Sequence, residues 1–89
     1  MIAGLNTVIV ADGATGRNAA LAWLRTIPGA CVVAFTDHAA GALAAMAEFP
    51  VDMLVLDAAL PEPTRYVLGH HANVAHLSLQ LMPCPVKNT

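Results

Sequence analysis

The stretch between Pro50 and Pro61 constrains the fold of this chain more than any other feature. It is rich in Val and Leu and carries one acid, Asp57, near its carboxyl end. This composition and the two flanking prolines predict a strand that is buried on both faces of a parallel sheet. Ligands of open α/β sheets bind at the carboxyl ends of strands, so Asp57 is a candidate for chemistry. Alternatively, Asp57 only caps the turn that follows the strand.

The rest of the first 61 residues alternates between strand-like and helix-like stretches. The strand-like stretches are apolar and partly β-branched, whereas the helix-like ones have apolar residues at helical spacing and end at prolines. Such alternation with short connections predicts an α/β fold with a parallel sheet and right-handed crossovers. The predicted strands are residues 7–11, 30–35 and 51–60, and the predicted helices are residues 15–27 and 38–48.

The pattern after Pro61 is weaker. Pro63 can open a short helix over residues 64–68, which Gly69 would end, and residues 74–79 are predicted to form a fourth strand. Two prolines within residues 82–87 argue against a further central strand there.

The histidines and cysteines match no common metal-binding pattern. His70, His71 and His76, taken with Cys84, lack the spacing of a zinc site, and solvated loop histidines, with His76 on a strand face, are the simpler interpretation. Cys31 lies in an apolar run and is expected to be a small core residue.

Length, composition and charge restrict the class of protein. The 89 residues predict one domain spanning 1–89. A composition that is 57% hydrophobic and 11% charged predicts surplus apolar surface, and therefore a protein partner or an oligomer. A net charge of −2 and only four Lys and Arg residues argue against direct nucleic-acid binding. No stretch resembles a secretion signal or a membrane span, so a cytoplasmic protein is expected.

Asp12 and Asp57 each follow a predicted strand. The first and third strands of a doubly wound sheet are neighbours, which would bring the two carboxylates within reach of a shared cation. Mg²⁺ is the ion that such a sparse oxygen site suits.

Residues 8–12, Arg17 and residues 51–61 together resemble the receiver domain of bacterial two-component response regulators. The most specific motif is Asp52, an apolar run, Asp57, two residues, and then Leu60-Pro61. The match covers residues 1–61, whereas residues 62–89 diverge. The resemblance implies a flavodoxin-like, CheY-like three-layer sandwich with an open parallel sheet.

The resemblance also implies a signalling phosphoacceptor rather than a turnover enzyme. Asp57 would accept a phosphoryl group from a phosphohistidine on a sensor histidine kinase and so switch a protein-interaction surface. Asp12, Asp57 and the backbone carbonyl of Ala59 would hold Mg²⁺. Ser78 would supply the hydroxyl that responds to the phosphoryl group, and Lys87 would replace the lysine of the fifth strand.

Two departures from the receiver pattern support a different hypothesis. Receivers carry a pair of acids at the end of the first strand, but the first position here is Ala11, which should lower metal affinity. The chain is also too short for the family's fourth helix, a normal fifth strand and the fifth helix, so the fold is expected to be incomplete at its C-terminus. The alternative is a pseudo-receiver that is never phosphorylated and acts as an interaction or dimerisation module. The unpaired sheet edge predicts a homodimer, with exchanged C-terminal segments as one arrangement.

A third hypothesis rests on residues 13–19. This glycine-containing turn after a strand is similar to the phosphate-binding turn of Rossmann proteins, and Asp37 ends the second strand where a ribose-binding acid would lie. It implies an NAD(P)-binding fragment. However, Asp12 separates the strand from Gly13, and Ala19 stands where the third glycine is expected.

Overall fold

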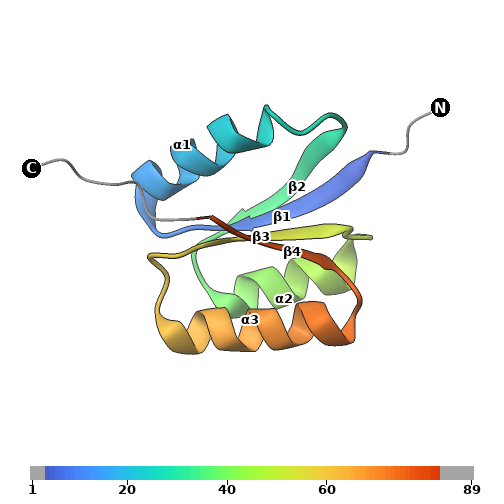
Figure 1. Cartoon of the computed structure of the whole chain (residues 1–89). Coiled ribbons are helices and arrows are strands. Elements are labelled where there is room, and N and C mark those ends of the chain that lie inside the picture. Colours follow the sequence, from blue (N-terminus) through green and yellow to red (C-terminus); the bar gives the residue numbers. More distant parts are fainter. Residues whose placement is uncertain (1–3, 83–89) are drawn as a thin grey trace, which may run out of the picture.

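A four-stranded parallel sheet lies between helices in the computed structural model, which describes residues 4–82 (Figure 1). The strand–helix alternation predicted for the first 61 residues is confirmed, and one more helix and strand follow. The elements are β1 (Leu5–Val10), α1 (Gly13–Leu24), β2 (Ala30–Thr36), α2 (Ala39–Glu48), β3 (Met53–Asp57), α3 (Glu62–Val74) and β4 (Ser78–Met82).

The strand order is β2-β1-β3-β4, and every neighbouring pair is parallel. All five residues of β3 are buried, as the Val- and Leu-rich stretch predicts for a central strand. Val10 pairs with Leu56, so the carboxyl ends of β1 and β3 lie side by side. The sheet therefore brings the segments that follow these strands, including Asp12 and Asp57, to one edge.

Two apolar cores form because each strand presents alternate side chains to opposite faces of the sheet. One core lies beneath α2 and α3 and the other beneath α1, which covers the opposite face (Figure 1). The first core is built on Val8, Val10, Leu54 and Leu56 of the sheet, and the second on Ile9, Met53 and Val55. Full burial of each such side chain contributes roughly 1.5–3 kcal/mol.

The helix after Pro61 is longer than predicted. It spans Glu62–Val74 and continues through Gly69, with Leu68 and Ala72 buried against the sheet. A single interior glycine costs a helix only about 1 kcal/mol, and this packing outweighs it. His70 and His71 are therefore helical rather than loop residues. Within residues 4–82, no helix combines the length and apolar character that crossing a membrane requires.

Three further expectations for the second half of the chain and for β2 are wrong. The fourth strand begins at Ser78 rather than at Val74, because His76 adopts a left-handed turn with φ of 60° just before it. His76 thus lies in a turn, not on a strand face. Cys31 is exposed rather than buried, since β2 is an edge strand and is covered incompletely.

Candidate functional site

Asp57 ends β3 in a closed environment that is built from two loops. Only 2% of the residue is exposed. Its Oδ1 accepts a hydrogen bond of 3.0 Å from the backbone N–H of Ala59, and its Oδ2 accepts one of 3.4 Å from the backbone N–H of Asp12. Both carboxylate oxygens therefore accept backbone hydrogen bonds, and Asp57 joins the loop after β1 to the loop after β3.

Gly16 closes the site from the side of α1. A Cβ at this position would collide with Asp57 Oδ2 and would lie 3.3 Å from the Cβ of Ala11. Residue 16 lies within the predicted helix, and the Rossmann-like interpretation places it in a phosphate-binding turn; in the structure it is a buried residue of α1. Only a residue without a side chain lets the helix approach the acid this closely. Sequence reasoning missed this role because the contact joins two segments that are distant in the chain.

The predicted Mg²⁺ ligands Asp12, Asp57 and Ala59 are brought near one another at the carboxyl ends of β1 and β3. Asp12 is exposed, and its N–H rather than its carboxylate contacts Asp57; likewise Ala59 contributes its N–H. Ala11 is buried in the apolar core where an acid would have been a further ligand. Each Asp57 oxygen accepts one backbone hydrogen bond and keeps a lone pair, so these contacts leave oxygen ligands for a hard cation. Mg²⁺ binding stays a prediction.

The prediction that Ser78 lies beside Asp57 is wrong. Ser78 pairs with Met53, whereas Asp57 pairs with Met82. Four residues of strand separate the two positions, or about 13 Å at roughly 3.3 Å per residue. Because the strand begins later than expected, Ser78 lies at the amino end of β4, on the far edge of the sheet. Lys87, the other predicted phosphoryl contact, lies outside the described residues.

Asp52, the first acid of the motif, helps to align two strands of the sheet. It precedes β3 at the amino edge of the sheet, where its Oδ2 accepts a 2.9 Å hydrogen bond from the backbone N–H of Asn6. The Asn6 side chain in turn donates to the carbonyl oxygen of Pro50 at 2.8 Å. These contacts align the start of β3 with the start of β1.

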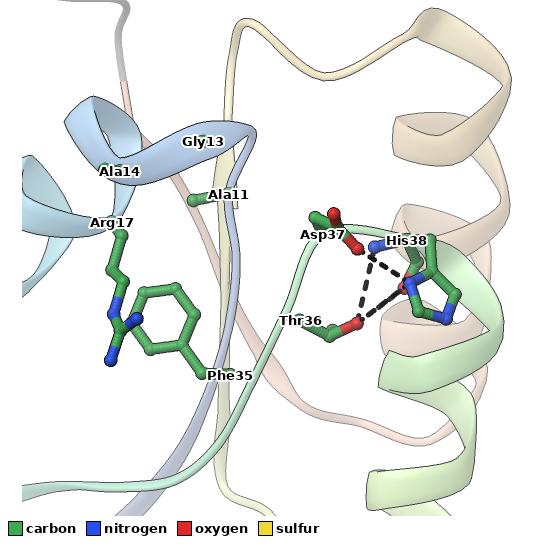
Figure 2. A pocket seen from close by; sticks show the side chains of 8 residues that line it. All are labelled: Ala11, Gly13, Ala14, Arg17, Phe35, Thr36, Asp37 and His38. Carbon is green, nitrogen blue, oxygen red and sulfur yellow. Dashed lines mark hydrogen bonds and ion pairs between the residues drawn. The ribbon is translucent and has the colours of Figure 1, made fainter.

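A separate cleft lies at the carboxyl ends of β1 and β2 (Figure 2). On one side the guanidinium carbon of Arg17 lies 4.8 Å from the centre of the Phe35 ring. On the other, His38 Nδ1 lies 2.8 Å from Asp37 Oδ1. The hydrogen bond with His38 is the main cause that lowers the pKa of Asp37. The lining residues are Ala11, Gly13, Ala14, Arg17, Phe35, Thr36, Asp37 and His38.

The cleft brings together part of the residue set that resembles a Rossmann turn. Gly13 and Asp37 both line it, so the loop after β1 does face the acid after β2. Gly16 does not line it and instead faces Asp57. Within residues 4–82, no group of three or more His, Cys, Asp or Glu side chains is arranged to hold a metal ion.

Comparison with known proteins identifies a similar fold but no family. No protein-family model and no curated protein matches the chain. Among solved structures, the chain is similar to one in the crystal structure of the P1 domain of CheA3 in complex with CheY6 from R. sphaeroides. The TM-score is 0.61 at 22% sequence identity, and the alignment covers 99% of this chain and 88% of that chain. At this identity the likeness establishes a shared α/β fold.

Proposed function

We propose that this chain is a receiver-like signalling module that acts through protein contacts and does not depend on phosphorylation. The observation that carries this proposal is the closed state of Asp57, whose two oxygens accept backbone hydrogen bonds beneath Gly16. A carboxylate held in this way works as a structural link between loops. Ala11 and the distant Ser78 support the same conclusion, since neither can assist phosphoryl transfer at Asp57.

The assignment to a receiver-like class rests on topology and on the kind of protein that shares it. The order β2-β1-β3-β4 corresponds to the first four strands of the flavodoxin-like order 2-1-3-4-5, in which CheY-like proteins are built. The similar solved chain comes from a complex between CheA3 and CheY6. A signalling protein is therefore the kind of partner that we propose for this chain, and the cytoplasm its location.

The surface formed by α3 and β4 is where we place the protein contact. On β4 the exposed apolar side chains are Leu79 and Leu81, and α3 separately exposes Tyr66, Val67 and Val74. Among residues 4–82, β4 pairs only with β3, so its outer edge offers hydrogen-bonding groups to another chain. Apolar side chains beside an open strand edge favour association, and a homodimer is the simplest form of it.

Phosphoryl acceptance is the second candidate function. The observation in its favour is the position of Asp57 at the carboxyl end of β3, directly across from the segment that carries Asp12. In this mode a sensor histidine kinase would be the phosphodonor. Asp57 is only 2% exposed and α1 lies against it, so the elements around it would have to move apart before a phosphodonor could reach it, which costs free energy.

Incubation with Mg²⁺ and acetyl phosphate, followed by intact-mass measurement, separates the two functions. A response-regulator receiver in the same mixture serves as the positive control, and Asp57→Asn as the negative one. The proposal expects no added phosphoryl group on this chain while the control receiver is modified. A single adduct that Asp57→Asn abolishes would refute phosphorylation independence and establish the second candidate.

A further inference from the structure

The cleft beside Arg17 lies at the carboxyl ends of β1 and β2, one strand away from Asp57 on β3. It has a volume of about 610 Å³, within the range of small-molecule sites. Asp57 does not line it. The residues that line it near β1 have small side chains, since Ala11 and Ala14 carry only methyl groups. No atom lies within 4 Å of the position that a Cβ on Gly13 would occupy. The space in front of the loop after β1 is therefore open to a ligand.

Arg17 provides the positive side of the cleft. Its guanidinium stacks on the Phe35 ring, which holds the charge in place without neutralising it (Figure 2). Within residues 4–82 the ion pair that forms joins His38 to Asp37, so Arg17 has no carboxylate partner there. A positioned and unpaired guanidinium binds phosphate oxygens through two parallel hydrogen bonds. This wall of the cleft favours a phosphate group.

Asp37 and His38 form the opposite wall, where a ligand would have to present hydrogen-bond donors. Asp37 Oδ1 contacts His38 Nδ1, and within residues 4–82 Asp37 Oδ2 has no side-chain hydrogen-bond partner. A carboxylate repels an anion but accepts hydrogen bonds from hydroxyl groups. A molecule that satisfies both walls carries a phosphate at one end and hydroxyl groups at the other.

We propose that this cleft binds a phosphate ester that carries a vicinal diol, with the phosphate at Arg17 and the hydroxyl groups at Asp37. Nucleoside monophosphates and sugar phosphates share this chemistry. The proposal does not depend on the signalling role, because the cleft and Asp57 involve different side chains.

Titration of the ¹⁵N-labelled full chain with AMP, ribose 5-phosphate and inorganic phosphate tests the proposal. We expect both esters to shift the backbone signals of Gly13, Ala14 and the segment 35–38, and to bind more tightly than inorganic phosphate. Preference for AMP would identify a nucleotide site, and equal affinities a sugar-phosphate site; either supports the proposal. No shift at millimolar ester, or equal binding of inorganic phosphate, would overturn it.

Three variants separate the two walls. Arg17→Gln should weaken ester binding about tenfold, since it removes the charge-assisted hydrogen bonds to the phosphate. Arg25→Gln, in the same helix region but outside the cleft, is the matched control and should change nothing. Asp37→Asn should weaken both esters several-fold and leave inorganic phosphate unaffected. Arg17, Arg25 and Asp37 are exposed, so these changes should leave the fold intact; unchanged ester affinity in Arg17→Gln would refute the assignment.

Discussion

Replacing Gly16 by alanine tests whether α1 closes over Asp57. The added methyl group would collide with Asp57 Oδ2 and crowd the Cβ of Ala11. Overpacking of this kind costs about 1–3 kcal/mol. Alanine also favours the helix over glycine by about 1 kcal/mol, which offsets part of the cost. We therefore expect a net loss of about 1 kcal/mol in the free energy of unfolding.

Gly69→Ala is the matched control, because Gly69 also lies inside a helix. A Cβ there would only touch Leu79, at an ordinary contact distance of 3.8 Å. This variant should gain up to about 1 kcal/mol from helix propensity alone. Urea unfolding followed by circular dichroism measures both changes. A Gly16→Ala variant as stable as Gly69→Ala would show that α1 does not close over Asp57.

A double-mutant cycle identifies the partner in the collision. If the methyl group at position 16 meets the Asp57 carboxylate, Asp57→Ala should relieve most of the cost of Gly16→Ala. The two changes would then be non-additive by more than about 0.5 kcal/mol, the usual limit for independent sites. Additive losses would mean that the crowding lies elsewhere, for example against Ala11.

Three further predictions concern the Asp57 carboxylate, the contact between Asp37 and His38, and the edge strand β4. Asp57→Ala should lower the free energy of unfolding by about 1–3 kcal/mol because two backbone N–H groups lose their acceptor. Asp57→Asn keeps one acceptor oxygen and should cost less. Equal urea midpoints for the wild type and the Ala variant would contradict this. The hydrogen bond with His38 is the main cause that holds the pKa of Asp37 below its ordinary value of 3.8. The stabilisation from this hydrogen bond is therefore present above pH 3.8 and is lost as the pH falls through the lowered pKa. His38→Ala should raise the Asp37 pKa toward 3.8 in a carboxyl ¹³C NMR titration, and an unmoved pKa would rule out His38 as the cause. Leu81→Lys should reduce self-association in light scattering without loss of helix signal, whereas a wild-type chain that is monomeric at micromolar concentration would refute the homodimer.

The sequence motif around Asp57 predicts the strand but not the accessibility of the acid. The run from Asp52 to Pro61 correctly indicates a buried strand that ends in an acid, because Val and Leu on both faces suit only a central strand. It cannot indicate whether that acid is accessible. Accessibility depends on how closely α1 approaches, and that is decided by Gly16, a residue 41 positions earlier in the chain.

The segment after Pro61 shows the opposite case, in which local signals mislead. Gly69 predicts the end of a helix, but α3 continues to Val74 because Leu68 and Ala72 are buried against the sheet. The longer helix and the turn at His76 delay β4, and this delay moves Ser78 to the far edge. Because β4 begins a few residues later than predicted, Ser78 does not lie beside Asp57.

The alternation of strands and helices and the central position of β3 follow from local hydrophobic patterns and their periods, so both can be predicted from the residues alone. The enclosure of Asp57, the distance of Ser78 from it, and the cleft shared by Arg17 and Asp37 follow from the three-dimensional packing. Each of these depends on strand register or on helix docking. Both arise from contacts between residues that are far apart in the chain, which no local pattern encodes.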